Sequence, residues 1–194
     1  MDEKTKEVNK QPEGKKFDRH NKDNKKRPRR VEKPKSDLED KVIAINRVTK
    51  VVSGGRQFRF SATVVVGNRK GKVGIGIGKA KEMPDAVKKA TQAASKNLIN
   101  VELIDNRTIS HEIIEKEGAV RVMLKPAKEG TGVIAGGSVR AILDLAGVRD
   151  VVSKSLGART KLNMAEAAMN GLKSMRTIEE VAQLRGKKEE ENLG

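Results

Sequence analysis

The stretch KVGIGIGKA, Lys72–Ala80, places glycine at every second position of a segment that is otherwise mostly apolar. A spacing of two is the period of a β-strand, because successive side chains of a strand point to opposite faces of the sheet. Glycine weakens a strand, so a bare backbone on one face suggests that something approaches it closely. The stretch predicts a strand that is approached either by another part of the chain or by a bound partner.

The preceding segment predicts the strand that pairs with it. Gln57–Gly67 alternates apolar with polar or small residues, and Asn68–Gly71 fits a hairpin turn between the two strands. Pairing Gly67 with Lys72 places Val66 opposite Val73, Val64 opposite Ile75 and Ala62 opposite Ile77, so these apolar residues share one face. In that register the glycines lie on the face away from the apolar side, beside small and polar residues.

A helix is expected to cover the apolar face of this sheet. Pro84 fits the first turn of such a helix, and the lysines lie away from its apolar stripe. Together with a β-branched run that begins near Leu38, residues 38–101 predict a three-stranded antiparallel sheet backed by a helix. That arrangement is one of the shapes that bind double-stranded RNA. The apolar stripe of the expected helix consists of Met83, Val87, Ala90, Ala94 and Leu98.

Residues 102–186 predict a second α/β domain with the order β-β-α-β-α, which makes the fold class α+β. The first helix follows a glycine-rich stretch, carries Val139, Ile142, Leu143 and Ala146 as its stripe, and ends at Gly147. The second helix carries Ala165, Ala168, Met169 and Leu172 on one face. The expected elements are strands at Thr108–Glu115, Ala119–Leu124 and Val151–Leu156, a helix at Met164–Met175, and a last short helix opened by a capping box at Thr177–Glu180.

Charge points to a polyanionic partner. The chain has 42 Lys and Arg against 26 Asp and Glu, a net charge of +16, which favours nucleic acid or an acidic membrane surface. Residues 1–37 predict a disordered basic tail in which KKRPRR fits a nuclear localisation signal or an RNA-binding arm. Residues 187–194 predict a charged tail. The face of the glycine strand could therefore meet an RNA backbone or another part of the chain.

Several classes of protein are disfavoured. The absence of cysteine excludes disulfides and thiolate metal sites and fits a reducing cytosol. No secretory signal is found, nor an apolar run of roughly 18 residues that would span a membrane. Phe17, Phe58 and Phe60 are the only aromatic residues, so the chain cannot build a platform of rings for base stacking. Recognition of RNA through phosphates, 2′-hydroxyls and shape is expected instead.

No motif predicts an enzyme, a cofactor or a metal. The phosphate-loop pattern fails because Val73 replaces its first glycine and Ala80 replaces its hydroxyl residue. Gly130–Ala135 matches a dinucleotide fingerprint, but no strand leads straight into it, and Asp150 precedes an apolar run instead of ending it. His111 is expected within a strand. The alternatives are a nucleotide-dependent enzyme built on the glycine turn and an RNA or DNA chaperone that uses the basic tail.

Two long blocks resemble one known family. Residues 41–90, KVIAINRVTKVVSGGRQFRFSATVVVGNRKGKVGIGIGKAKEMPDAVKKA, are similar to the first domain of the bacterial fifth protein of the small ribosomal subunit. Residues 124–157, LKPAKEGTGVIAGGSVRAILDLAGVRDVVSKSLG, resemble its second domain. The resemblance covers residues 38–186.

The resemblance implies a non-enzymatic, cytoplasmic protein of the small ribosomal subunit that binds its ribosomal RNA without a small-molecule substrate. Such a protein would support the junction of the body and the head. It would contact the fourth and eighth small-subunit proteins. With the third and fourth it would line the channel through which messenger RNA enters, and it would influence decoding accuracy.

The resemblance and the local chemistry together give the candidate site residues. Residues 51–56 match the family loop that alters spectinomycin sensitivity, and its glycines would let the backbone approach RNA. A second group, Glu129, Gly130, Thr131 and Gly132, matches the region that meets the fourth protein. The expected RNA-binding residues are Arg47, Lys50, Ser53, Gly54, Gly55, Arg56, Arg59, Lys72, Lys79, Lys125 and Arg140.

Two segments depart from the family pattern. The family usually has a Gly-Asp/Asn-Gly type of turn where this chain has Asn68–Gly71 with added charge. After Gly157 the family commonly reads Ser-x-x-Pro-Ile-Asn-x-Val-Arg-Ala. Here Lys161 replaces the proline and Glu166 replaces the arginine, so the contacts of that segment are not carried over.

Overall fold

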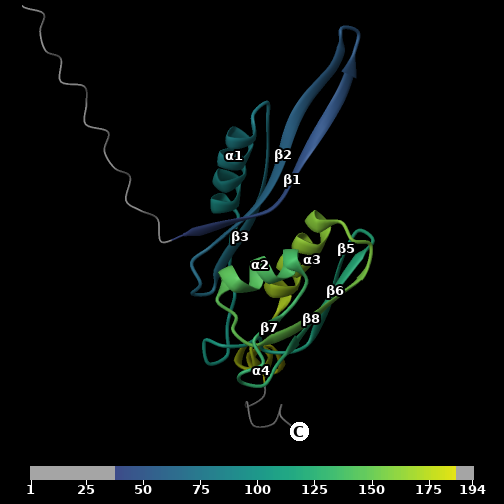
Figure 1. Cartoon of the computed structure of the whole chain (residues 1–194). Coiled ribbons are helices and arrows are strands. Elements are labelled where there is room, and N and C mark those ends of the chain that lie inside the picture. Colours follow the sequence, from purple (N-terminus) through teal and green to yellow (C-terminus); the bar gives the residue numbers. More distant parts are fainter. Residues whose placement is uncertain (1–37, 187–194) are drawn as a thin grey trace, which may run out of the picture. The chain divides into compact units, whose positions relative to one another are not determined.

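The computed structural model describes residues 38–186 of the chain. The basic tail expected at 1–37 and the charged tail expected at 187–194 lie outside the described residues. Figure 1 shows the elements, which are β1 (Glu39–Val52), β2 (Gly55–Gly67), β3 (Lys72–Ala80), α1 (Met83–Lys96), β4 (Leu98–Asn100), β5 (Ile113–Glu117), β6 (Val120–Pro126), β7 (Val133–Ile134), α2 (Gly137–Ala146), β8 (Val151–Gly157), α3 (Lys161–Ser174) and α4 (Ile178–Arg185).

The first sheet confirms the expected antiparallel sheet and adds a strand. Its strands follow the order β1-β2-β3-β4, and every neighbouring pair is antiparallel. The added strand, β4, has three residues, which is too short to show a period in the sequence. The helix α1 carries Pro84 in its first turn, as expected, and buries Ala86, Ala90 and Ala94 against the sheet. Of the predicted stripe, Met83 is exposed and Leu98 belongs to β4.

The glycines of β3 lie on the face that packs against α1, so the predicted register is wrong. Gly67 pairs with Val73 instead of Lys72, and a shift of one residue moves every side chain of a strand to the other face. A Cβ added at Gly76 would overlap the carbonyl oxygen of Ala90, and one at Gly78 would overlap that of Ala86. The close approach that the glycines indicated is made by the backbone of α1, and not by RNA or by the second half of the chain.

The second sheet has the strand order β5-β6-β8-β7, in which β7 and β8 are parallel and the other pairs antiparallel. The strand β7 was not predicted from the sequence, because it has only two residues. The first strand begins at Ile113 instead of Thr108, and His111 lies in a bend before it. The helices α2 and α3 bury their predicted stripes.

The ends of the helices follow from their capping residues. Gly147 ends α2 in the left-handed conformation with φ 92°, as expected of a glycine in this position. The Thr177 side chain accepts a hydrogen bond from the Glu180 backbone N–H at the start of α4, which is half of the predicted capping box. Lys161 is the first residue of α3. The family proline is therefore lost from a position that favours proline but does not require it.

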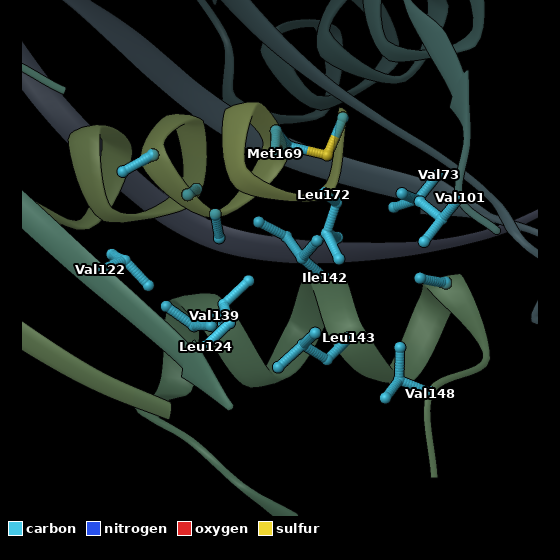
Figure 2. Close-up of a cluster of buried hydrophobic side chains, with 14 of the residues drawn as sticks. Val73, Val101, Val122, Leu124, Val139, Ile142, Leu143, Val148, Met169 and Leu172 are labelled. Carbon is cyan, nitrogen blue, oxygen red and sulfur yellow. The ribbon is translucent and has the colours of Figure 1, made fainter. Parts of the chain in front are cut away.

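The larger hydrophobic core contains residues from both sheets. Val65 and Val73 of the first sheet belong to the same buried cluster as Ile142 of α2 and Leu172 of α3. Figure 2 shows side chains of α2 and α3 pointing toward each other in this cluster. A smaller core lies between α1 and the first sheet. The β2 strand thus contributes alternate residues to two cores, which explains why its second half, residues 62–67, is buried on both faces.

The hairpin turn between β2 and β3 contacts the end of α2. The backbone N–H of Arg69 donates to the carbonyl of Leu145 at 2.9 Å, and that of Gly71 donates to Ala146 at 2.8 Å. The last carbonyls of a helix have no partner within the helix, so the turn supplies partners that α2 lacks. Arg69 adopts φ 56° there, a conformation that few non-glycine residues take up. The guanidinium of Arg69, which carries part of the added charge of this turn, pairs with Glu39 of β1 at 2.7 Å.

Candidate nucleic-acid interface

The strands β1 and β2 continue beyond the third strand as a two-stranded hairpin, the β1–β2 arm, which we define as residues 47–60 (Figure 1). The pairing of β2 with β3 ends at Phe60 opposite Ala80. Ser53 and Gly54 form the turn at the tip of the arm. An added Cβ at Gly54 would meet nothing within 4 Å. The backbone at the tip is thus open to a large partner.

The arm carries cations on both faces and no carboxylate. Between residues 41 and 81 the sequence has ten Lys and Arg and no Asp or Glu. The strand register places Arg47 and Arg56 on the face that continues from α1, and Lys50 and Arg59 on the opposite face. Among residues 38–186, no carboxylate forms an ion pair with any of these four cations. The arm therefore presents uncompensated positive charge to solvent.

The structure brings together eight of the eleven predicted RNA-binding residues. Lys79 lies opposite Ser61 at the base of the arm, and the other seven lie on the arm itself. Lys72 lies at the far end of β3, opposite Asn100. The remaining two belong to the second half and contact carboxylates, Lys125 with Glu112 at 2.9 Å and Arg140 with Asp144 at 3.9 Å.

One aromatic ring is exposed on the arm. Phe58 is 44% exposed, and the guanidinium carbon of Arg47 lies 3.7 Å from the centre of its ring. The other phenylalanine of the described residues, Phe60, packs against the core beneath α1. Phe58 and Arg47 form an exposed cation–π pair. One aromatic ring is therefore available at this surface, although the composition favoured recognition of RNA without aromatic residues.

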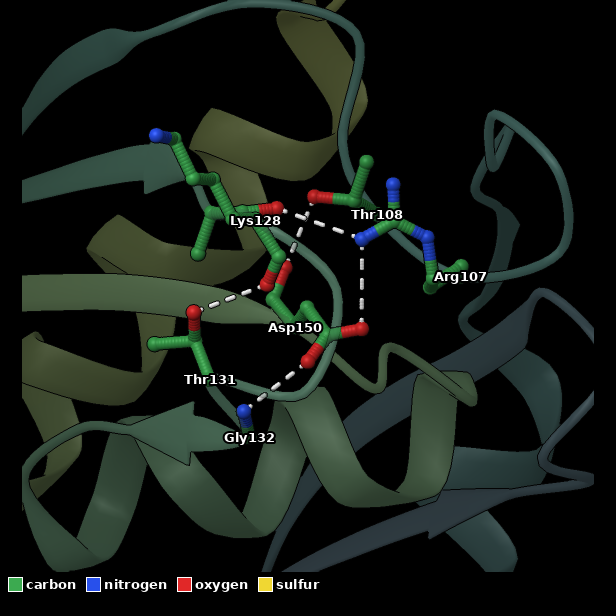
Figure 3. A network of polar contacts seen from close by, with 7 residues as sticks. Arg107, Thr108, Lys128, Thr131, Gly132 and Asp150 are labelled. Carbon is green, nitrogen blue, oxygen red and sulfur yellow. Dashed lines mark hydrogen bonds and ion pairs between the residues drawn. The ribbon is translucent and has the colours of Figure 1, made fainter.

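The predicted protein-interface residues lie in the loop between β6 and β7, which we call the 127–132 turn. The side chain of Asp150 stabilises this turn through hydrogen bonds and an ion pair. One carboxylate oxygen of Asp150 accepts from the Gly132 backbone N–H at 2.9 Å. The other oxygen pairs with Arg107 at 3.2 Å, and Arg107 also donates to the carbonyl of Ala127 at 3.3 Å. Figure 3 shows the contacts of Gly132 and Arg107 with the two carboxylate oxygens of Asp150. Both ends of the turn are therefore tied to one side-chain pair.

The contacts of Asp150 stabilise its charged form. The residue is 5% exposed. The Gly132 N–H and the Arg107 guanidinium hold the pKa of the Asp150 carboxyl below its ordinary value, against the opposing effect of burial. Thr108 adds a hydrogen bond from its hydroxyl to the Asp150 carbonyl at 2.7 Å. Glu129, Gly130 and Thr131 remain exposed above this network. The turn is a rigidly supported surface loop.

The geometry of the glycine turn differs from that of a dinucleotide site. In a dinucleotide fingerprint the glycines connect a strand directly to a helix. Here the short strand β7 lies in the middle of the motif, and the Asp150 carboxylate is occupied by Gly132 and Arg107. The stretch with the phosphate-loop pattern is the strand β3. Within residues 38–186 no cluster of three His, Asp or Glu side chains is arranged to hold a metal ion.

Two family models match the chain. The model described as ribosomal protein S5, N-terminal domain, matches residues 38–102. The model described as ribosomal protein S5, C-terminal domain, matches residues 115–185.

The chain belongs to the ribosomal protein S5 family.

The matches confirm the family that the resemblance indicated and make the chain a protein of the small ribosomal subunit. The S5 family consists in general of ribosomal components and not of enzymes. The first match begins one residue before β1 and contains the whole β1–β2 arm. The second contains the 127–132 turn and Asp150. No helix between residues 38 and 186 is long and apolar enough to cross a membrane.

Sequence reasoning missed three residues of these sites. The sequence raises Asp150 only in connection with the dinucleotide fingerprint and does not indicate Arg107, because 43 positions separate the two. The burial of Asp150, which shows that its charge needs a partner, is seen only in the structure and not in the sequence. The alternating pattern of residues 57–67 predicts a strand that contains Phe58. It does not show that the pairing of β2 with β3 ends at Phe60, two residues short of Phe58.

Proposed function

We propose that this chain binds the RNA of the small ribosomal subunit chiefly through phosphate contacts of the β1–β2 arm. The observation that carries the proposal is the uncompensated charge of the arm, where four cations on two faces have no carboxylate between residues 41 and 81. Phosphate contacts fix a protein on RNA without reading its sequence. The open backbone at Ser53, Gly54 and Gly55 allows RNA to approach the tip.

The finer roles implied by the family form part of the same proposal. The chain supports the junction of the body and the head in a cytoplasmic ribosome of the bacterial type, and contacts the eighth small-subunit protein. The 127–132 turn meets the fourth protein, and its rigid support by Asp150 suits a surface on which decoding accuracy depends. With the third and fourth proteins the chain lines the channel through which messenger RNA enters.

The salt dependence of binding tests the role of the arm. Each phosphate contact contributes about 0.7 to 0.9 to the slope of log K against log salt concentration. Arg56→Ala should therefore weaken binding to small-subunit ribosomal RNA and reduce the slope by about that amount. Lys88→Ala is the matched control, because Lys88 lies on α1 and pairs with Asp85 at 3.9 Å. Equal slopes for the two variants would refute the arm as the phosphate-binding surface.

Sedimentation tests the location of the chain. Cell extract is separated on a sucrose gradient at moderate and high salt, and the fractions are blotted for this chain. An integral component should co-migrate with the small subunit at both salt concentrations. A chain that is free, or is removed by salt, would contradict the proposal and favour a chaperone that acts through its charge alone.

A further inference from the structure

The exposed ring of Phe58 is an apolar group among the positively charged side chains of the arm. Phe58 is 44% exposed, and on the same face of the hairpin Val51 is 73% and Ile45 40% exposed. An apolar patch rimmed by charge is typical of an interaction surface. The phosphate contacts proposed above use the cations of the arm and leave this ring without a role.

The pairing of the strands leaves β2 without a strand neighbour beside Phe58 on one side. Arg47 belongs to β1 and lies over the Phe58 ring from that side, 3.7 Å from its centre. On the other side of β2 the neighbouring strand would be β3, but its pairing ends at Phe60. No strand therefore flanks Phe58 on the side away from Arg47. A flat group can approach the ring there while the guanidinium supports its opposite face.

The charges around the ring favour an anionic partner that is also aromatic. Arg47 and Arg56 lie on the same face of the hairpin as Phe58, and the arm has no carboxylate. An apolar protein surface would cover the ring but would bury two guanidinium groups without partners, which is unfavourable. A nucleotide offers a planar base for the ring and a phosphate for the guanidinium groups.

We propose that Phe58 and Arg47 form a stacking site for one unpaired nucleobase of structured RNA. The base stacks on the open side of the Phe58 ring, Arg47 supports the ring from behind, and Arg56 contacts a flanking phosphate. The inference rests on the proposed RNA binding and adds a ligand class to it. A single ring accepts one base, so the target is a bulged or flipped nucleotide beside a helix, and not an extended single strand.

Binding of two matched RNAs tests the site. One probe is an RNA duplex of about 16 base pairs, the length that a double-stranded-RNA-binding fold spans. The other is the same duplex with a single bulged 2-aminopurine, whose fluorescence reports stacking. Stacking of one base on an aromatic side chain is worth about 5- to 150-fold in affinity. The full chain should bind the bulged RNA at least about fivefold more tightly and change the fluorescence of the bulge.

Variants separate stacking from charge. Phe58→Leu keeps an apolar side chain but removes the ring, and should abolish the preference for the bulged RNA while retaining binding to the duplex. Phe58→Tyr keeps the ring and should retain the preference. Arg56→Ala should weaken binding to both RNAs. Phe60→Leu is the matched control, because Phe60 is directed to the core beneath α1 and not to the open site.

Two outcomes would overturn the inference. Equal binding of both RNAs, with unchanged fluorescence of the bulge, would refute stacking while leaving phosphate binding by the arm intact. No binding to either RNA would refute the stacking site together with the proposed function. The fluorescence measurement uses the unsubstituted chain, so the test holds even if Phe58→Leu fails to fold.

Discussion

The glycines of β3 and the glycines of the exposed turns differ in what surrounds them. Gly74, Gly76 and Gly78 face the backbone of α1, and a side chain at any of them would collide with it. Gly54 at the arm tip and Gly132 beside β7 have nothing within 4 Å of an added Cβ. The first group brings a helix close to a sheet, whereas the second keeps backbone accessible or permits a turn. Glycine in a stretch of sequence therefore indicates close approach or open backbone, and only its neighbours in space distinguish them.

The largest effect is expected at the packed glycines. Gly76→Ala places a Cβ against the backbone of Ala90 and Ala94, so α1 must move away from the sheet. Overpacking costs about 1 to 3 kcal/mol, and a backbone obstacle places this variant at the upper end, near about 3 kcal/mol. Urea unfolding of the purified chain measures the loss. Gly54→Ala is the matched control, and equal unfolding midpoints would contradict the role assigned to Gly76.

The second largest loss of stability is expected when the support of the 127–132 turn by Asp150 is removed. Asp150→Asn removes the charge that pairs with Arg107 and weakens the acceptor for the Gly132 N–H. Asp150 is buried but the Arg107 side chain is 26% exposed, so water can partly solvate the guanidinium that loses its partner. The variant should therefore unfold at a lower temperature than the wild type, with a smaller loss than Gly76→Ala. Thermal unfolding at neutral pH measures this. Lys125→Ala, which breaks an exposed pair with Glu112, should change stability much less.

The Asp150 contribution also depends on pH. Its pKa is lowered in the folded chain, so the stabilisation is complete above the ordinary carboxyl pKa of the unfolded chain. It is lost as the pH falls through the lower pKa of the folded chain. The difference in unfolding temperature between wild type and Asp150→Asn should therefore be largest near neutral pH and shrink in acid. A difference that grows in acid would contradict the charged network.

A smaller effect is expected where a turn requires a positive φ. Gly132 has φ 75° with open space around it, so an alanine there meets strain but no collision. The left-handed conformation costs a non-glycine residue about 1 to 2 kcal/mol. Gly136→Ala is the control, because Gly136 has φ −64° and equally open space. Chemical denaturation of both variants should show a loss for Gly132→Ala alone.

The smallest effect on stability is expected at the arm tip. Gly54→Ala adds a methyl group where nothing lies within 4 Å, so the free energy of unfolding should change by no more than about 0.5 kcal/mol. Binding to small-subunit ribosomal RNA should nevertheless weaken, because the backbone can no longer approach a phosphate as closely. Parallel unfolding and RNA titrations separate the two. Unchanged RNA affinity would assign the tip no role in contact.

The fold was largely predictable because most elements carry a clear period. The stripes of α2 and α3 gave both helices, since each is buried along one face. The register of β2 and β3 was not predictable from apolar matching, because valines occupy both faces of β2. Both registers bury apolar residues, and the choice depends on how closely α1 approaches. Strands of two or three residues, such as β7 and β4, have no period to detect.

The candidate site was predictable where it is local in sequence. The tip loop and the cations of the arm are close together along the chain, so their grouping follows from one hairpin. The pair of Arg107 and Asp150 joins two loops that lie 43 positions apart, and no local pattern in the sequence indicates it. The exposure of Phe58 depends on where β3 stops pairing, which is a property of the sheet and not of the residue.

The turn that contacts the end of α2 has a consequence for the order in which the chain folds. Arg69 and Gly71 donate their backbone N–H groups to Leu145 and Ala146, residues that are synthesised much later. During translation the first sheet can pair its strands as soon as they emerge, but its hairpin turn gains these two partners only after α2 has been made. In the nascent chain the turn between β2 and β3 therefore lacks two hydrogen-bond partners until α2 supplies them.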